Sequence, residues 1–504
     1  MVTRCRPMGA GDDHQRADLE SELTILFETY WPHVVLVVTT VVGVVAAVHA
    51  AMTKDDVRAA IGWVGVIIFS PFIGAILYLL AGINRVRRTA IGQRRAEAEG
   101  GRFHPADPAD VEVDDRLDPD YQSMKRVGDA VAAFPLTAGN RVDLLSGGDE
   151  AYPAMLAAIK GARKHIAMAS YIFDNDHVGG RFADALAAAV KRGVEVRVLI
   201  DAVGARYSRP PITHRLRGDK VPTALFLGNL IGFKLPYANL RSHRKILVVD
   251  GAVAFTGGMN IREGFVAAHT EGAPARDTHF RVEGPAVAQL MTVFAHDWRF
   301  TTRESLDGAA WARAEPHPPA AGAVAARVIP SGPDRNLACT HGMIMAALAV
   351  ARSRVRIASP YFLPDQQLIG ALVVAARRGI EVDVVIPSAN NLKLVDYAMT
   401  AQLDQIVASG CRVWRATGPF DHSKLMAVDG VWAYVGSSNL DPRSLRLNFE
   451  LDLEIHDPAT AAAVDAYIAQ EISTALPETM ATLGARSLPV RIRNRAIWLA
   501  SPYL

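Results

Sequence analysis

Two stretches of the chain place a histidine, a lysine two residues later and an aspartate five residues after the lysine. They contain His243, Lys245 and Asp250 in the first copy, and His422, Lys424 and Asp429 in the second. Residues two apart on a strand project from the same face, so each copy presents an imidazole beside an ammonium group. Imidazoles can serve as nucleophile, acid or base, and ammonium groups can neutralise charge on phosphate oxygens. The repeated pair predicts chemistry on a phosphate ester.

Each aspartate of this pattern is followed by a glycine, Gly251 or Gly430, and then by an apolar run. Asp-Gly between two apolar runs is a strong signal for a type I′ hairpin turn. This signal favours a turn-forming role for Asp250 and Asp429 over a role as proton donors, although both belong to the candidate catalytic set.

A corner of small residues follows each predicted hairpin. The corners read Thr256-Gly257-Gly258-Met259-Asn260 and Val435-Gly436-Ser437-Ser438-Asn439. Small residues such as Gly258 and Ser437 let backbone amides approach a phosphate. The side-chain amides of Asn260 and Asn439 can donate hydrogen bonds to its oxygens. We therefore expect both corners to bind the phosphate of the substrate.

The two motifs belong to an internal duplication. Residues 164–176 are similar to 354–366, and residues 185–201 are similar to 371–387. Each half reads strand, helix, strand, which is the pattern of βαβ units in a mostly parallel sheet. We therefore expect an α/β fold with two tandem domains, each built on a mixed sheet with flanking helices.

Composition sets the expected boundaries of these domains. Residues 315–322 are rich in proline and can continue neither a helix nor a strand, and residues 96–130 are polar and acidic. The predicted organisation is an N-terminal tail (1–29), a membrane region (30–85), a linker (86–130), a first domain (131–312), a short linker (313–325) and a second domain (326–504).

Two apolar segments, 30–52 and 61–83, precede the domains, and neither contains Lys, Arg, Asp or Glu. Each is close to the ~20 residues that a helix needs to cross a bilayer, and Pro71 is tolerable inside such a helix. Arginines 85, 87, 88, 94 and 95 follow the second segment. The positive-inside rule then predicts a multi-pass protein of the cytoplasmic (inner) membrane, with its catalytic domains on the cytoplasmic side.

Two other interpretations of the apolar segments are less favoured. Val48-His49-Ala50 faintly resembles a signal-peptide cleavage site, but the apolar stretch starts late and is long for a signal peptide. A buried hairpin of a soluble core is disfavoured because both segments are apolar on every face.

Composition excludes some classes of function. The formal net charge of +2 gives no general reason to expect a nucleic-acid partner. Cys5, Cys339 and Cys411 are widely separated and form no CxxC pair, which disfavours a disulfide framework or a thiolate metal site. Tyr171 and Tyr361 lie on equivalent predicted strands, and we interpret them as core aromatics in preference to residues of a cleft.

Together, these motifs make the sequence resemble the phospholipase D superfamily, and within it the bacterial cardiolipin synthases. The resemblance covers most of the chain, including the second apolar segment and four further phrases. These phrases are 239–245, 276–285, 359–365 and 448–450. Leu240 departs from the aromatic residue that many relatives carry, and the tail before Glu20 has no counterpart that we can interpret.

The resemblance implies that both halves face one cleft and that the chemistry runs through a covalent phosphohistidine, without a metal or other cofactor. By analogy His243 is the nucleophile and His422 is first the acid and then the base; the reverse assignment stays open. Asp277 and Glu450 match the downstream acidic positions of the two halves. The resemblance implies that each of them orients an imidazole.

The implied reaction transfers a phosphatidyl group from one phosphatidylglycerol to another and gives cardiolipin and glycerol. The expected partners are phosphatidylglycerol, other anionic phospholipids and the membrane, and no nucleic acid; the oligomeric state stays open. A hydrolytic phospholipase D or other phosphodiesterase on the same fold is the alternative enzyme. A non-catalytic membrane scaffold is disfavoured by the two intact His-Lys pairs.

Near the C-terminus, Arg491, Arg493 and Arg495 alternate with apolar residues. This pattern fits a contact with a membrane surface, and it fits an ordinary terminal helix equally well.

Overall fold

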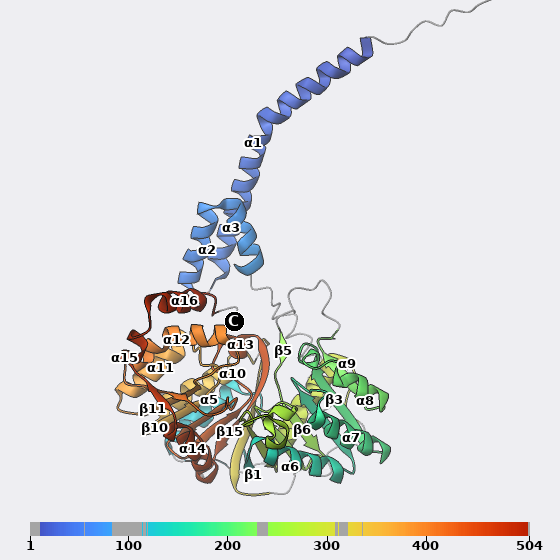
Figure 1. Cartoon of the computed structure of the whole chain (residues 1–504), viewed down its shortest axis with the longest axis vertical. Helices are drawn as coiled ribbons and strands as arrows, with labels where there is room; N and C mark the ends of the chain where they lie inside the picture. Colours follow the sequence, from blue (N-terminus) through green and yellow to red (C-terminus); the bar gives the residue numbers. More distant parts are fainter. Residues whose placement is uncertain are drawn as a thin grey trace, which may run out of the picture. The chain divides into compact units, whose positions relative to one another are not determined.

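The computed structural model describes residues 11–54, 56–82, 113, 117, 119–228, 240–307, 311, 321–334 and 336–501. The chain forms two units, Met1–Arg87, called here the N-terminal unit, and Arg88–Leu504, called the C-terminal unit. In the described residues, the first is built of helices and the second of a large sheet with flanking helices (Figure 1).

The described residues of the N-terminal unit form one long helix and three short ones. Its elements are α1 (Gly11–Thr53), α2 (Val57–Phe69), α3 (Pro71–Leu77) and the π-helix η1 (Tyr78–Gly82). Among the described residues, Thr24–Thr53 within α1 is the one helix long and apolar enough to cross a membrane. The predicted apolar helix over 30–52 is therefore confirmed.

The second apolar segment, 61–83, is not one continuous helix. It is divided at Ser70, whose φ of −146° and ψ of 79° leave the helical region, and Pro71 starts the next helix. Proline lacks the N–H that a continuous helix needs and clashes with the preceding turn, so the segment breaks there. Gly74 then permits close packing, because an added Cβ would lie 2.5 Å from the carbonyl oxygen of Val66. Our prediction of a second spanning helix is not confirmed.

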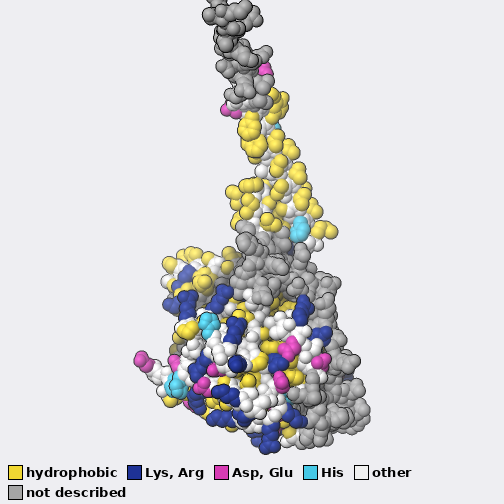
Figure 2. Space-filling view, turned by 90° about the vertical axis from the view of Figure 1, so that its right-hand side faces the viewer, with side chains coloured by type: hydrophobic (Ala, Val, Ile, Leu, Met, Phe, Trp, Pro, Cys, Tyr) yellow, Lys and Arg dark blue, Asp and Glu magenta, His cyan; other side chains and the backbone are white. Residues whose placement is uncertain are grey.

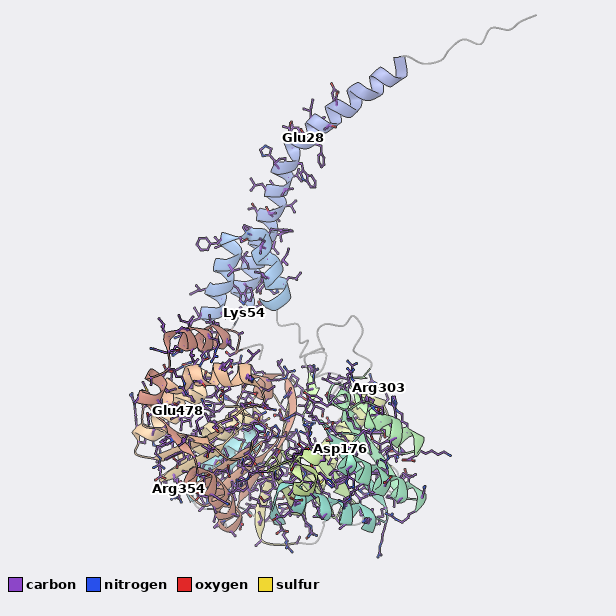
Figure 3. All side chains as sticks on the ribbon, in the orientation of Figure 1. Glu28, Lys54, Asp176, Arg303, Arg354 and Glu478 are labelled. Atoms are coloured by element: carbon purple, nitrogen blue, oxygen red, sulfur yellow. The ribbon has the colours of Figure 1, made fainter. Side chains whose placement is uncertain are left out.

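Few side chains of the N-terminal unit are buried. Ala50, Ile67 and Tyr78 form a small core, and Nδ1 of His49 lies 2.8 Å from the Tyr78 hydroxyl. Lys54, at the end of α1 (Figure 3), donates a hydrogen bond to the carbonyl of Gly82. The outer surface of this unit is covered with hydrophobic side chains (Figure 2). Such a surface is suited to apolar surroundings and agrees with association with a membrane.

The described strands of the C-terminal unit form one large sheet. Its strands are β1 (Thr137–Ser146), β2 (His165–Ser170), β3 (Glu195–Asp201), β4 (Thr223–Phe226), β5 (Arg241–Ser242), β6 (Ile246–Val249), β7 (Val253–Gly257), β8 (Thr278–Glu283), β9 (Val324–Ser331), β10 (Arg354–Ala358), β11 (Glu381–Pro387), β12 (Arg412–Ala416), β13 (Leu425–Val428), β14 (Trp432–Gly436), β15 (Asn448–His456) and β16 (Leu476–Glu478). Their order is β16-β12-β11-β10-β13-β14-β15-β9-β1-β8-β7-β6-β2-β3-β4, with β5 attached to β15.

The strand order repeats itself on either side of the β9–β1 pair. Going outward from that pair, β15, β14, β13, β10, β11 and β12 correspond to β8, β7, β6, β2, β3 and β4. The predicted duplication is therefore a structural one. Only β2-β3-β4 and β10-β11-β12 are parallel within the main sheet, and its remaining pairs are antiparallel. The α/β class and the mixed sheet are confirmed, while the expectation of a mostly parallel sheet holds only for these βαβ strands.

Helices cover the faces of the sheet (Figure 1). They are α5 (Pro119–Val131), α6 (Gly147–Gly161), α7 (His177–Lys191), α8 (Ile212–Gly218), α9 (Ala286–Thr302), α10 (Cys339–Val350), α11 (Gln366–Arg377), α12 (Lys393–Val407), α13 (Pro442–Arg446), α14 (Pro458–Ser473), α15 (Met480–Gly484) and α16 (Leu488–Trp498). Each half has its own core: Phe182 packs with Ile166 and Val198 in the first, and Trp432 packs in the second.

Helix α5 lies in the segment 86–130 that we predicted to be a linker. Its Tyr121 and Met124 are buried in the core of the second half, although the first half follows them directly in the chain. The Tyr121 hydroxyl also donates a hydrogen bond to Oδ2 of Asp429 over 3.0 Å. The end of the predicted linker is thus an ordered helix that packs on the second half.

Candidate active site

The two histidines of the repeated motif lie where the two halves meet. The backbone N–H of His243 donates to the carbonyl of Phe449 over 2.8 Å, and β5 pairs in parallel with β15 just before this point. The backbone N–H of His422 donates to the carbonyl of Arg276, also over 2.8 Å, next to a parallel bridge between Arg276 and Asp421. Each histidine is therefore held by a strand segment of the other half.

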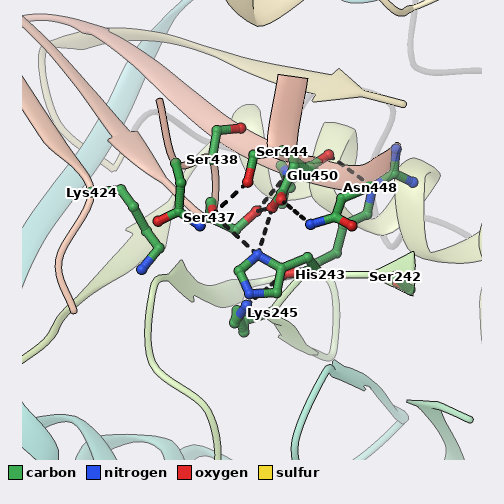
Figure 4. A network of polar contacts seen from close by, with 12 residues as sticks. Ser242, His243, Lys245, Lys424, Ser437, Ser438, Ser444, Asn448 and Glu450 are labelled. Atoms are coloured by element: carbon green, nitrogen blue, oxygen red, sulfur yellow. Dashed lines mark hydrogen bonds and ion pairs between the residues drawn. The ribbon is translucent and has the colours of Figure 1, made fainter. Parts of the chain in front are cut away.

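The carboxylates are exchanged between the halves in the same way. Nδ1 of His243 lies 2.8 Å from Oε2 of Glu450 (Figure 4), and Nδ1 of His422 lies 2.9 Å from Oδ2 of Asp277. The two imidazole centroids are 6.4 Å apart with an interplanar angle of 81°. Because Nδ1 of each ring is engaged, Nε2 is the atom left to react. The separation of the rings lets one phosphorus atom come within reach of both.

Glu450 and Asp277 lie in different electrostatic surroundings. Burial raises the pKa of Glu450, although the charge of Lys245 and hydrogen bonds from Ser437 and Asn448 oppose the shift. For Asp277 burial also acts to raise the pKa, but the hydrogen bond from His422 and the charge of Lys424 outweigh it and lower the pKa below its ordinary value. Asp277 is therefore the more firmly ionised carboxylate of the two.

Both lysines of the motif are buried beside the rings. Nζ of Lys245 donates to the carbonyl of His243 over 2.6 Å, and Nζ of Lys424 donates to the carbonyl of His422. Burial lowers the pKa of Lys245 to about 7 and that of Lys424 to about 8. Burial and the lysine charges lower the pKa of His422 to about 3 and that of His243 well below its ordinary value. These shifts favour neutral imidazoles beside cationic groups, as a nucleophile for an anionic ester requires.

The small-residue corners do not present their amides to a phosphate as we predicted. The N–H of Gly258 donates to Thr278, and the N–H of Ser437 donates to Leu451, so both are used within the sheet. The reason for small residues here is space for the carboxylates: a Cβ on Gly258 would lie 2.3 Å from Oδ1 of Asp277. Ser437 instead donates its hydroxyl to Glu450 and offers its carbonyl to Nδ1 of His243 (Figure 4).

The two asparagines of the corners are buried at the predicted place, after β7 and β14. Oδ1 of Asn260 accepts a hydrogen bond from the backbone N–H of Ile172 over 3.1 Å. Nδ2 of Asn439 donates to Oγ of Ser444 over 3.3 Å. The hydrogen bond from Ile172 occupies the acceptor of the Asn260 side chain, and the remaining amide group, Nδ2, is a donor.

Asp250 and Asp429 lie in turns, away from the imidazoles. Asp250 and Gly251 have φ of 55° and 66°, and Asp429 and Gly430 have φ of 52° and 69°, which are the positive values of type I′ turns. The carboxylate of Asp250 accepts hydrogen bonds from the backbone N–H groups of residues 163, 164 and 165, and that of Asp429 from those of 352, 353 and 354. The turn-forming role that we favoured for both aspartates is the one observed.

Two tyrosines that we interpreted as core residues flank the histidines. The ring of Tyr171 lies 5.1 Å from that of His243, and the ring of Tyr361 lies 6.2 Å from that of His422. The Tyr361 hydroxyl donates to Oδ1 of Asn391 over 2.9 Å. Their equivalent positions in the two repeats were the signal that could have identified them as site residues.

Arg244 is a further residue that sequence reasoning missed. It is fully buried, its Nη1 lies 2.8 Å from both carboxylate oxygens of Asp297, and its Nε donates to the carbonyl of Glu450 over 2.9 Å. Its Nη2 also donates to the carbonyl of Ser331 over 3.1 Å. Arg244 thus connects the first histidine motif to the strand that carries Glu450. An arginine between the histidine and the lysine of the motif was the available signal.

Among the described residues, no group of three or more His, Cys, Asp or Glu side chains could hold a metal ion.

Comparisons with known proteins agree with this geometry. A family model described as "Cardiolipin synthase, PLD-like domain" matches residues 155–298 and 344–472, and one described as "Phospholipase_D-nuclease N-terminal" matches residues 41–82. Cardiolipin synthase A of Pseudomonas putida (strain GB-1) is 33% identical over 84% of this chain and 88% of its own length. Cardiolipin synthase A of Pseudomonas aeruginosa (strain LESB58) is 34% identical over 88% of this chain and 90% of its own length.

Among solved structures, phosphatidylserine synthase of Haemophilus influenzae Rd KW20 is similar with a TM-score of 0.58. It is 17% identical, and the match covers 76% of this chain and all of that one. At this identity the likeness shows a shared fold.

Proposed function

The chain belongs to the cardiolipin synthase family of phospholipase D-like phosphatidyltransferases, and we propose that it joins two phosphatidylglycerol molecules into cardiolipin and glycerol through a phosphohistidine. The observation that carries the proposal is the pair of facing imidazoles, 6.4 Å apart, each with its Nδ1 on a carboxylate of the other half. Two such rings can attack phosphorus from one side and protonate the leaving oxygen on the other.

In the first step, Nε2 of His243 attacks the phosphorus of the donor phosphatidylglycerol. The N–P bond forms while the bond from phosphorus to the glycerol oxygen breaks. His422, protonated when the anionic donor is bound, gives its proton to this oxygen, and glycerol leaves. The phosphatidyl group stays on His243 as a phosphodiester-like adduct.

In the second step, the terminal hydroxyl of another phosphatidylglycerol attacks the same phosphorus. The now neutral His422 takes the hydroxyl proton, the N–P bond breaks, and cardiolipin is released with His243 regenerated. One phosphodiester replaces another, so the exchange needs no activated donor. Water can attack in place of the lipid alcohol, and its exclusion decides between transfer and hydrolysis.

The two carboxylates support this division of roles. An acid must hold a proton on its ring, and an ionised carboxylate at Nδ1 stabilises the resulting imidazolium. The lowered pKa of Asp277 supports that role for His422, whereas the raised pKa of Glu450 suits a ring that reacts in its neutral form, His243. The roles that we assigned by analogy thus have a physical basis.

Negative charge grows on the non-bridging phosphate oxygens in the transition state. Cationic groups or hydrogen-bond donors must stabilise it. Lys245 and Lys424 lie beside the two rings, and we assign this task to their ammonium groups, with Asn260 and Asn439 as further donors. The phosphate itself would raise the pKa of both lysines when it binds, because an anion favours the charged form.

The N-terminal unit would hold the enzyme in the cytoplasmic membrane, with α1 as a spanning helix. A multi-pass topology with the C-terminal unit on the cytoplasmic side belongs to the same proposal, supported by Arg85, Arg87 and Arg88 after the apolar segments. Proteolysis of spheroplasts and of inverted vesicles tests the side: cleavage within the C-terminal unit is expected only in inverted vesicles.

The reaction is tested with the purified full chain in phosphatidylglycerol micelles that contain a chelator and no nucleotide-linked lipid. Cardiolipin and glycerol should appear in equal amounts, and His243→Ala and His422→Ala should each abolish them. Phosphatidic acid as the sole lipid product, or loss of activity with the chelator, would contradict the proposal.

A further inference from the structure

We propose that α16, together with the start of α12, is an interfacial element that seats one end of the C-terminal unit on an anionic phospholipid bilayer. The surface consists of Leu488, Ile492 and Leu499 of α16 and its C-cap, Leu392 and Leu394 at the start of α12, and the cations Lys393, Arg491, Arg493 and Arg495. The proposal rests on the proposed function, because the lipids concerned are its substrates.

The apolar part of this surface is exposed although its side chains are large. Leu488 is 65% exposed, Ile492 is 59% exposed and Leu499 is 74% exposed. Their spacing of four and seven residues places them in one stripe along the helix. Leu392 and Leu394 add 47% and 55% exposed side chains at the start of α12, which packs against α16. Exposed apolar stripes of this kind mark a contact surface.

The charge of α16 is of one sign. Its sequence, LPVRIRNRAIW, contains three arginines and no acidic residue, and all three arginines are exposed. A helix with an apolar stripe bordered by arginines matches an interface in which acyl chains lie beside anionic headgroups. A protein partner would need an apolar groove lined with acidic groups, and phosphatidylglycerol supplies both features at once.

Contacts on the inner side of α16 fix its orientation, so the same apolar side chains remain exposed. Asn494 is buried, and Nε1 of Trp498 donates to Oε1 of Gln402 over 2.9 Å. The guanidinium of Arg493 stacks on the ring of Tyr397 at 3.6 Å, and Arg495 pairs with Asp404 at 2.7 Å. Three contacts with α12 thus orient the leucine and isoleucine side chains outward.

The surface lies at the same end of the C-terminal unit as the active site. In Figure 1, α16, α12, α13 and β5 all lie at one end of this unit, and β5 leads directly to His243. Seating this end on a bilayer would bring the reacting imidazoles near the headgroups of donor and acceptor. It would also restrict the access of water to the phosphohistidine.

The placement is tested with the full chain in vesicles whose acyl chains carry bromine. An environment-sensitive bimane is attached at position 492 through Ile492→Cys, in a Cys5→Ser background, because Cys339 and Cys411 are buried. We expect strong quenching in phosphatidylglycerol vesicles and clearly weaker quenching in phosphatidylcholine vesicles. Arg491→Glu should lower the seated population at least about fivefold, since one cation near an anionic surface contributes that factor.

Ala463→Cys is the matched control, because Ala463 is exposed on α14, at the opposite end of the unit in Figure 1. Equal quenching at 463 and 492, or none at 492, would overturn the proposal. The proposal would also be overturned if the bimane at 492 were shielded in detergent without lipid and the mass of the particle doubled. A second copy of the chain would then cover the stripe.

A kinetic measurement separates this proposal from the proposed function. Ile492→Glu should raise the phosphatidylglycerol fraction needed for half-maximal rate in vesicles about fivefold or more, and leave kcat in detergent micelles unchanged. If the unaltered chain makes no cardiolipin, the proposed function fails while the quenching result stands. If Ile492→Glu has no effect in vesicles, the role of the surface fails while the function stands.

Discussion

The two halves of the C-terminal unit share a strand order but prepare their histidines differently. The first half supplies Asp277 to His422, with a lowered carboxylate pKa, and the second supplies Glu450 to His243, with a raised one. A symmetric scaffold thus carries an asymmetric pair of imidazoles. The difference teaches that duplication can bring two like imidazoles together while their carboxylate partners give them different electrostatic surroundings.

The two halves also differ at the position two residues after each carboxylate, on β15 and on β8. Asp452 on β15 accepts hydrogen bonds from Ser437, Ser438 and Tyr434, and burial raises its pKa to about 6. The equivalent residue on β8 is His279, whose Nδ1 has no hydrogen-bond partner among the described residues. Burial lowers the pKa of His279 to about 4. A network of hydroxyl donors therefore lies behind Glu450, and a neutral ring lies behind Asp277.

The sharpest test of the comparison removes each imidazole in turn. His243→Ala and His422→Ala should each lower transfer from phosphatidylglycerol about 10⁴-fold. With a donor whose leaving group is nitrophenol, no acid is needed, so His422→Ala should still release about one equivalent of nitrophenol in a burst. His243→Ala should give no burst, and mass spectrometry of quenched His422→Ala should find the phosphatidyl group on the peptide that carries residue 243.

His177→Ala is the control for these variants, because His177 is exposed at the start of α7 and should leave both rates unchanged. A burst from His243→Ala and none from His422→Ala would exchange the two roles.

Neutral replacements of the two carboxylates, Asp277 and Glu450, should lower the rate by different amounts. Asp277→Asn should lower kcat about 10³-fold, because it removes the charge that stabilises a protonated His422. Glu450→Gln should cost about 10- to 100-fold, since its partner reacts in the neutral form and needs mainly orientation. Steady-state rates with phosphatidylglycerol measure both. Equal losses would mean that the carboxylate surroundings do not distinguish acid from nucleophile.

Arg244 has no counterpart in the second half, where Ser423 stands between the histidine and the lysine. Arg244→Met removes the guanidinium that pairs with the buried carboxylate of Asp297 and should lower the free energy of unfolding by about 3–5 kcal/mol. Ser423→Ala should cost at most about 1 kcal/mol. Chemical unfolding of the two variants in detergent measures the difference. Replacing Arg244 and Asp297 together, by Met and Leu, should recover much of the loss; no recovery would show that the ion pair is not its source.

Much of this architecture could be predicted from local pattern. The spacing of His243 and Lys245, the turns at Asp250 and Asp429, and the duplication all depend on residues close in sequence. The structure agrees with the turns and the duplication, but His243 and Lys245 lie between β5 and β6 and not on a strand as we expected. The break at Pro71 was visible as well, but we expected neighbouring groups to satisfy a continuous helix there. A proline after a serine in extended backbone ends the helix in this chain.

The exchange of carboxylates could not be predicted in the same way. The spacing of Asp277 and Glu450 is equally compatible with each carboxylate serving the histidine of its own half. The pairing of β5 with β15 and the bridge from Arg276 to Asp421 decide the matter, and both join segments far apart in sequence. Gly258 was misread for the same reason, because the carboxylate that needs its missing side chain approaches from another strand.

The smallest expected difference between the halves lies in the pKa values of their two lysines. Both must be protonated to stabilise the phosphate, and burial sets the pKa of Lys245 at about 7 and that of Lys424 at about 8. A group that must be charged loses its effect as pH rises through its pKa. Lys245 titrates first, so kcat/KM should fall about tenfold per pH unit between the two pKa values and about a hundredfold per unit above both. Replacing Lys245 by aminoethylated cysteine, whose amine is less basic, should shift this limb to lower pH. The same change at Lys424 should shift the limb less, and the same change at the exposed Lys191 should not shift it.

If the change at 424 shifts the limb more than the change at 245, the second half holds the more weakly charged lysine. The electrostatic difference between the halves is then opposite to the one inferred from the structure.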